Sequence, residues 1–239
     1  IAAASTLAGM AVPRVHAAGD NTIKLALVGC GGRGTGAVGN AFAATGGPVK
    51  LVAMADLFEP RLTNSLGRLA NSHADKIDVP PERQFIGFDA YKKAIDCLGP
   101  GDCVLLTTHA AFRPMMFEYA VGAGVNVFAE KSFATDGPNT RRWLAAAEAS
   151  EKKNLKVGVG FMWRHSKARQ EVIRRIHDGA IGDIVAMQPM FLRGPYRLEK
   201  REPGMTETQF QFRNWYHFCW LSGDDVPQSL VHNMDRMSW

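Results

Sequence analysis

The chain has 239 residues, of which 46% are hydrophobic and 21% charged, a composition typical of a globular protein with a substantial core. The formal net charge is +5, but the basic residues are scattered and form no stripe interleaved with aromatic residues. The sequence therefore gives no support to a nucleic-acid-binding surface, whereas mild basicity suits a small anionic ligand such as a dinucleotide. No stretch supplies the roughly 18 apolar residues of a membrane span, so we expect no span in the mature chain.

The first 18 residues consist mainly of small and apolar side chains and contain Val15-His16-Ala17 near their end. This pattern resembles the end of a signal-peptide apolar region followed by its cleavage site. We therefore interpret residues 1–18 as a signal-peptide remnant, with an alanine-rich terminus that has no targeting role as the alternative. The first interpretation predicts an exported protein and the second a cytoplasmic one.

From Thr22 onward, short apolar runs alternate with amphipathic segments. Strands are predicted over Ile23–Val28, Val49–Ala55, Gln84–Phe88, Asp102–Thr108, Asn126–Ala129 and Lys156–Phe161. Helices are predicted over Thr35–Ala44, Glu59–Ser72, Asp89–Leu98, Arg113–Gly122 and Asn139–Lys152, with Asp89 as a helix cap. This alternation predicts an α/β domain over residues 19–161, with a doubly wound parallel sheet of the Rossmann type.

After Phe161 the pattern changes, and we expect residues 162–239 to belong to a second domain. A helix is predicted over Lys167–Asp178 and a strand over Asp183–Phe191. Leu192–Asp225 is polar, aromatic and irregular, which indicates either a substrate-lining loop or an oligomer contact. The aromatic cluster in this segment could stack on a sugar ring, or it could belong to a core or an interface; its members include Trp215, Tyr216 and Trp220.

The four cysteines show neither CxxC pairing nor a histidine at zinc spacing. We expect free thiols and no metal site. If the protein is exported, a disulfide is possible, but the sequence does not indicate a pairing.

The segment Gly29–Gly34 has the sequence GCGGRG and fits the pattern G-x-G-x-x-G. It follows a predicted buried strand, opens a helix and precedes Asp56, which ends the next strand. This context predicts a dinucleotide-binding loop. The predicted cofactor-binding residues of this part are Gly29, Gly31, Gly32, Arg33, Gly34 and Asp56.

Each of these positions has a physical reason. Gly29 permits the tight turn, Gly31 lets the backbone approach a pyrophosphate, and Gly34 allows close packing of helix on strand. The helix N-terminus supplies free N–H groups to the phosphates. Asp56 would accept hydrogen bonds from the adenosine ribose and repel a 2′-phosphate, which favours NAD over NADP. Arg33 could contact phosphate, which keeps NADP open.

The segment after the predicted strand Asn126–Ala129 consists of Glu130-Lys131, followed by Ala134-Thr135-Asp136. It resembles the E-K-P…A-x-D segment of the Gfo/Idh/MocA oxidoreductases, the relatives of glucose–fructose oxidoreductase and inositol dehydrogenase. Further similar segments, in the same order along the chain, are Thr107–Pro114, Gly160–His165, Gly179–Gly182, Leu221–Asp224 and Val231–Asp235.

The resemblance implies an NAD(P)-dependent oxidoreductase that acts on CH–OH groups of carbohydrates. It also implies that the second domain is the first part of an α+β substrate and oligomerisation domain built on an open, mainly antiparallel sheet. Lys131 and His232 would be the catalytic acid/base pair. Further cofactor contacts implied are Thr107, His109, Glu130 and Lys131. The implied substrate contacts are Lys131, Arg164, Gln228, His232 and Asp235.

The residue types suit oxidation of a secondary alcohol, which loses a hydride from carbon and a proton from oxygen. A lysine whose pKa is lowered can accept the proton, and a histidine titrates near neutrality already. Two positions depart from the family pattern. Ser132 replaces the usual proline after the lysine, which removes a constraint often associated with a cis peptide bond, and Gln228 stands where many members have an aspartate.

Two alternatives stay open on this scaffold: an NAD-dependent glycoside hydrolase or lyase that uses transient oxidation, and a non-catalytic protein that binds NAD and sugar. The expected partner is a small carbohydrate, and the full-length protein is expected to form a homo-oligomer, as family members do. If the enzyme is exported, it must load its cofactor first, which predicts twin-arginine export to the periplasm.

Overall fold

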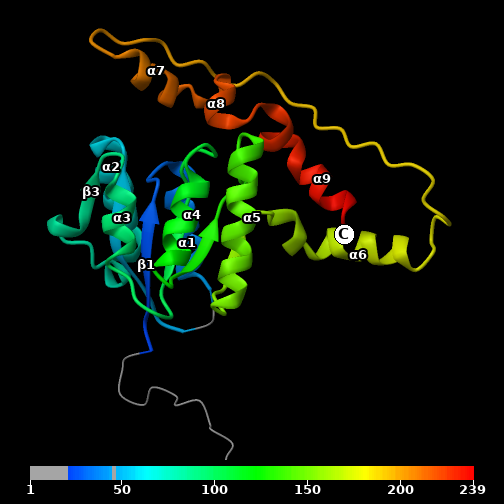
Figure 1. Cartoon of the computed structure of the whole chain (residues 1–239), viewed down its shortest axis with the longest axis horizontal. Helices are drawn as coiled ribbons and strands as arrows, with labels where there is room; N and C mark the ends of the chain where they lie inside the picture. Colours follow the sequence, from blue (N-terminus) through cyan, green and yellow to red (C-terminus); the bar gives the residue numbers. More distant parts are fainter. Residues whose placement is uncertain (1–20, 45–46) are drawn as a thin grey trace, which may run out of the picture.

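The computed structural model describes residues 21–44 and 47–239 (Figure 1). The predicted signal-peptide remnant, residues 1–18, lies outside the described residues. None of the helices in the described ranges is long and apolar enough to cross a membrane. All four cysteines are free thiols in this structure.

The described strands form one parallel sheet in the order β3-β2-β1-β4-β5-β6. Their bounds are β1 (Ile23–Val28), β2 (Val49–Asp56), β3 (Gln84–Ile86), β4 (Cys103–Leu106), β5 (Asn126–Ala129) and β6 (Val157–Val159). This is the strand order of a Rossmann-type sheet, and it confirms the predicted α/β fold. Strands β2 and β3 are added on one side of β1, and β4 to β6 are added on the other side. This change between β1 and β4 is the switch point of the sheet, and it leaves a crevice at the carboxyl ends of these two strands.

Helices cover both faces of the sheet because β1 is apolar on both sides. Leu25 and Leu27 face one core with α1 and α2, whereas Ala26 and Val28 face the other with α3, α4 and α5. The bounds of these helices are α1 (Gly32–Phe42), α2 (Glu59–His73), α3 (Ala90–Ile95), α4 (Arg113–Gly122) and α5 (Gly137–Lys152).

Most predicted boundaries lie within three residues of the observed ones. Helix α1 begins at Gly32, inside the glycine loop, three residues earlier than predicted. Asp89 precedes α3, but its side chain makes no capping hydrogen bond and pairs with Lys92 at 2.7 Å instead. The predicted cap is therefore wrong, whereas Asp136 does cap α5 by accepting from the Asn139 N–H at 2.8 Å.

Beyond β6, helix α6 (Lys167–His177) forms as predicted, but the predicted strand Asp183–Phe191 is wrong. This stretch is extended, yet no strand in the described part of the chain pairs with it. A strand exists only where a neighbour satisfies its N–H and C=O groups. Its side chains are accordingly solvent-exposed, with Val185 96% accessible.

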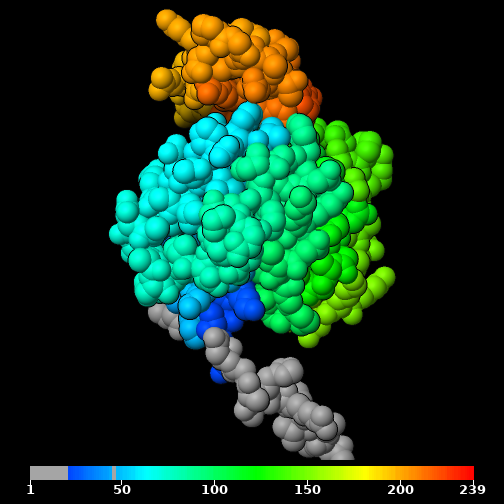
Figure 2. Space-filling model, turned by 90° about the vertical axis from the view of Figure 1, so that its left-hand side faces the viewer, coloured from blue at the N-terminus to red at the C-terminus, as the bar shows by residue number. Residues whose placement is uncertain are grey.

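The segment after residue 206 is more regular than predicted. It forms α7 (Glu207–Arg213), the 3₁₀ turn η4 (Trp215–His217), α8 (Cys219–Ser222), the π-helical turn η5 (Val226–Leu230) and α9 (Val231–Met237). Helices α7 and α8 lie beyond the arrowhead end of β1, above the sheet (Figure 1). Figure 2 shows the orange part of this segment lying over the cyan and green body. We call residues 207–222 the cap.

Candidate functional site

The glycine loop connects β1 to α1 at the switch point of the sheet. Gly29 has φ of +98°, and a Cβ there would lie 2.8 Å from the main chain of Thr107 and Thr108. A Cβ on Gly34 would lie 2.0 Å from the Gly29 carbonyl oxygen. Close backbone approach therefore requires glycine at both positions.

Gly31 and Gly32 are open in contrast. A Cβ on Gly32 would meet nothing within 4 Å, and one on Gly31 would meet only an Arg61 nitrogen at 3.7 Å. Both glycines line the cavity described below. Gly31 also precedes α1 without a side-chain cap. The first N–H groups of α1 are thus free to bind a phosphate at this end of the helix.

Asp56 ends β2 and is fastened to the glycine loop. One carboxylate oxygen accepts from the Cys30 N–H at 2.6 Å and the other from the Phe58 N–H at 2.9 Å. Each oxygen keeps a second lone pair, and the side chain lines the cavity. The carboxylate is therefore held in position to accept hydrogen bonds from a pair of hydroxyls.

Arg33 forms an ion pair across the switch point, with its Nε 2.5 Å from a carboxylate oxygen of Glu130. The Glu130 side chain is 9% exposed, and a Cβ on Gly160 would collide with its carboxylate at 2.6 Å. Arg33 thus compensates a buried negative charge, in addition to lining the cavity where a phosphate contact was predicted.

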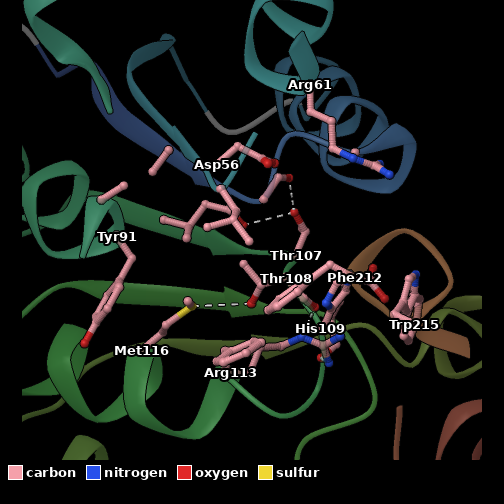
Figure 3. Close-up of a pocket in the computed structure, with 18 of the residues that line it drawn as sticks. Asp56, Arg61, Tyr91, Thr107, Thr108, His109, Arg113, Met116, Phe212 and Trp215 are labelled. Carbon is pink, nitrogen blue, oxygen red and sulfur yellow. Dashed lines mark hydrogen bonds between the residues drawn. The ribbon is translucent and has the colours of Figure 1, made fainter. Parts of the chain in front are cut away.

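A cavity of about 550 Å³ opens at the carboxyl ends of the strands, within the usual size range of small-molecule sites. The glycine loop and Asp56 line it together with residues from the loops after β4 and β5 and from the cap; Figure 3 shows Asp56, Thr107, Thr108, Phe212 and Trp215 among them. The predicted residues that it brings together are Gly29, Gly31, Gly32, Arg33, Asp56, Thr107, His109, Glu130, Lys131 and Gln228. Gly34 does not line the cavity and acts only through packing.

Arg113 is 3% exposed and organises the floor of this cavity. Its Nε donates to the Thr108 carbonyl at 2.8 Å, and its Nη1 donates to the carbonyls of Glu130, at 2.6 Å, and Ser132. Burial lowers the pKa of Arg113 to about 10, so the group stays charged at neutral pH. It therefore fixes the loops after β4 and β5 against one another.

Lys131 reaches the cavity from the end of β5, and its Nζ donates to the main-chain carbonyl of Gln228 at 2.5 Å. Burial lowers the pKa of Lys131 to about 8, with Glu130 opposing the shift and Arg113 adding to it. A lysine with this pKa exchanges protons near neutral pH.

His109 lies against the cap, stacked on Trp215 with ring centroids 4.9 Å apart. Figure 3 shows Trp215 and Phe212 beside His109. Burial, and then the nearby guanidinium groups of Arg113 and Arg61, lower the pKa of His109 to about 3. The imidazole is neutral at pH 7 and can offer one donor and one acceptor.

The other predicted catalytic residue, His232 on α9, does not line this cavity. It is 7% exposed, and its Nδ1 is buried without a hydrogen-bond partner among the described residues. Its ring packs against that of Trp163, with ring centroids 5.2 Å apart. Burial lowers the pKa of His232, and the charge of Lys131 lowers it further, so the two groups sense one another electrostatically.

The predicted substrate contacts Arg164 and Asp235 pair with each other at 2.7 Å. Asp235 also accepts from the Trp239 indole at 3.2 Å. Both residues lie beside His232 in sequence or structure rather than in the cavity. No group of three or more His, Cys, Asp or Glu side chains that could share a metal ion occurs in residues 21–44 and 47–239.

Comparisons with known proteins agree with this architecture, although no protein-family model matches the chain. The chain is 27% identical over 136 residues to inositol 2-dehydrogenase 4 of Saccharopolyspora erythraea, covering 55% of this chain and 38% of that protein. It resembles the structure of myo-inositol 2-dehydrogenase from Lactobacillus plantarum with a TM-score of 0.53 and 25% identity, covering 69% of this chain and 43% of that one. The resemblance to the Gfo/Idh/MocA oxidoreductases is confirmed.

The likeness in fold extends over most of the chain. The structure of aldose-aldose oxidoreductase from Caulobacter crescentus matches 90% of this chain and 56% of that one, with a TM-score of 0.61. At 18% identity this match shows a shared fold only. The chain spans about two fifths of the length of the inositol 2-dehydrogenase that it matches, at 38% of that protein.

The two departures from the Gfo/Idh/MocA pattern contact one another. Ser132 Oγ donates to Gln228 Oε1 at 3.0 Å, and both residues are buried. The peptide bond between Lys131 and Ser132 is cis, although no proline follows the lysine.

Sequence reasoning missed several residues of the site. Arg61 lines the cavity from α2 and approaches Gly31, and its place five residues after Asp56 was an available signal. Arg113 was noted only as part of a motif. Phe212 had no signal, because the contact of α7 with the loop after β4 joins distant parts of the chain.

Proposed function

We propose that this chain carries the cofactor site of an NAD-dependent oxidoreductase that acts on a hydroxyl group of a sugar or polyol. The observation that carries the proposal is that the glycine loop, Asp56 and Lys131 all line the same cavity. The first group suits a dinucleotide, and the lysine suits a proton transfer. The inositol dehydrogenases named above are the relatives that favour a polyol substrate.

The residues present fit a dinucleotide. Gly31 and Gly32 leave an open cradle in front of α1, and Asp56 is positioned for two ribose hydroxyls. A 2′-phosphate would meet the Asp56 charge, which favours NAD over NADP. When bound, the nicotinamide supplies the hydride acceptor or donor. Thr107, His109, Glu130 and Lys131 are the further residues proposed to contact it.

The chain's own contribution is to position groups and to move a proton. Lys131, with its pKa lowered to about 8, accepts a proton from the substrate hydroxyl during oxidation and returns one during reduction. His232 is proposed as its acid/base partner, and Arg164, Gln228 and Asp235 as substrate contacts. The similarity of the segment Val231–Asp235 to the family motif supports this pairing.

Titration calorimetry and a turnover assay test the proposal. The purified protein should bind NAD at least tenfold more tightly than NADP, and Asp56→Asn should weaken NAD binding and narrow that ratio. A panel of polyols and sugars should include one that produces NADH, followed at 340 nm. Absence of NAD binding would refute the cofactor assignment. Cleavage of a glycoside without net NADH would refute the oxidoreductase assignment.

We further propose that residues 19–161 form the cofactor domain, that residues 162–239 begin the substrate domain, and that the full-length protein is a homo-oligomer. The composition of residues 1–18 supports export, and the need to bind a dinucleotide before leaving the cytoplasm favours the twin-arginine route to the periplasm. Fractionation of cells that express the full-length gene tests this, since cytoplasmic protein with an intact N-terminus would contradict it.

A further inference from the structure

Gln228 makes two hydrogen bonds to the loop that carries Lys131. Its main-chain carbonyl accepts from Lys131 Nζ at 2.5 Å, and its side-chain Oε1 accepts from Ser132 Oγ at 3.0 Å. Ser132 is 1% exposed and Gln228 is 4% exposed, so the hydrogen bond between their side chains is shielded from water. These residues lie 96 positions apart in sequence, so the contacts join the end of β5 to η5 across the molecule.

Both ends of this contact are firmly held. Arg113 donates to the main-chain carbonyls of Glu130 and Ser132, which fixes the loop after β5. On the other side, Pro227 packs close to Gly223, where a Cβ would lie 2.8 Å from the proline ring. The Ser132–Gln228 hydrogen bond therefore links two supported segments.

The charges around Lys131 show why an amide at position 228 matters. Glu130, the residue before Lys131, and Arg113, the first residue of α4, act on Lys131 with opposite signs, and the charge of Lys131 in turn lowers the pKa of His232 on α9. From η4, the Tyr216 hydroxyl interacts with the Gln228 side chain. Gln228 adds hydrogen-bonding capacity to this group without adding a charge. A carboxylate in its place would favour the charged ammonium.

We infer that Ser132 and Gln228 act as a positioning pair that orients the Lys131 amine toward the cavity and keeps the side chain beside it uncharged. Ser132 holds the Gln228 side chain, and the Gln228 carbonyl then holds Nζ. The pair thereby sets the pH range in which Lys131 can accept a proton. This inference rests on the proposed function only for its catalytic consequence.

The direct test is the titration of Lys131 in the protein without ligands. Competitive labelling by acetic anhydride at a series of pH values, with mass spectrometry of the Lys131 peptide, gives the pKa of the amine. The wild-type pKa should be about 8, and Gln228→Glu should raise it by about one unit or more. Ser229→Ala is the matched control, because Ser229 is buried on the same turn but bonds Tyr196.

Ser132→Ala provides a second, milder variant whose fold can be checked by thermal melting. It should lower kcat about tenfold, since a small misplacement of a catalytic group is costly, with the KM for NAD unchanged. The inference is overturned if the pKa of Lys131 is the same in Gln228→Glu as in Ser229→Ala. Should Gln228→Glu not fold, the inference is overturned if Ser132→Ala keeps the wild-type kcat. Failure of the proposed function is distinguishable, because the labelling shift requires no turnover.

Discussion

At the scale of single residues, the site depends on how the surroundings of the loop after β5 change the pKa of the Lys131 amine. Lys131 lies beside a carboxylate whose charge Arg33 already compensates, and beside a guanidinium committed to backbone carbonyls. Burial then dominates, and the pKa of Lys131 falls to about 8. A surface lysine would stay fully protonated at that pH.

The expected pH dependence follows from this pKa. Oxidation of a hydroxyl requires the neutral amine, whose fraction rises as the pH rises through about 8. We therefore expect kcat for oxidation to increase across that range and kcat for reduction to decrease, measured at saturating cofactor. Lys131→Met should reduce both by 10²-fold or more, on the order of a lost general acid/base. Lys50→Ala, at the exposed start of β2, serves as control. A profile that is flat between pH 6.5 and 9 would contradict a proton-transfer role for Lys131.

At the scale of elements, the glycine loop shows which parts of the fold were predictable. The spacing of Gly29, Gly31 and Gly34 predicts the turn. In the structure, close backbone contacts require glycine at Gly29 and Gly34, whereas Gly31 leaves open space in front of α1. Strand and helix periodicity also predicted the order β1 to β6, because a strand buried on both faces and an amphipathic helix differ locally.

Contacts between distant segments were not predictable in the same way. The strand expected over Asp183–Phe191 has suitable side chains but no pairing partner among the described residues, and partnership is not a local property. The Ser132–Gln228 contact was equally hidden, although both residues stood out individually. Periodicity thus predicted the sheet, and the glycine spacing with Asp56 predicted the dinucleotide-binding part of the site. The cap and the contacts of η5 depend on tertiary packing, which local patterns do not predict.

A pair of glycine substitutions in α1 tests the packing argument. A Cβ on Gly34 would lie 2.0 Å from the Gly29 oxygen, whereas one on Gly39 would meet nothing within 4 Å. We expect Gly34→Ala to lower the free energy of unfolding by about 3 kcal/mol or more through overpacking. Gly39→Ala should raise it by about 0.5–1 kcal/mol, because alanine loses less entropy in a helix. Urea denaturation followed by circular dichroism measures both, and equal effects would show that the contact at Gly34 is not limiting.

At the scale of the whole molecule, the cap lies over the body that the sheet and its helices form (Figure 2), and its residues Phe212, Trp215 and Tyr216 line the cavity. Phe212 stacks on Phe112 with ring centroids 5.6 Å apart, and Trp215 stacks on His109. One backbone hydrogen bond, from the Ala111 N–H to the Leu221 carbonyl at 3.3 Å, joins the cap to the loop after β4. Aromatic packing therefore supplies most of the contact at this point, and residues of the cap wall the cavity beside those of the sheet.

This arrangement predicts that the cap limits release of a bound dinucleotide. Phe212 is 5% exposed and lines the cavity. Phe212→Ala should therefore leave an opening through which the dinucleotide can dissociate, and weaken the packing of Trp215. We expect the dissociation rate of NADH to rise about tenfold, with a smaller change in the association rate, because interface truncations act mainly on dissociation. Phe210→Ala is the matched control: Phe210 lies on the same helix but packs on Phe218 and does not line the cavity. Stopped-flow fluorescence of NADH displaced by excess NAD measures the rate. Equal dissociation from both variants would mean that the cofactor leaves by a route that the cap does not cover.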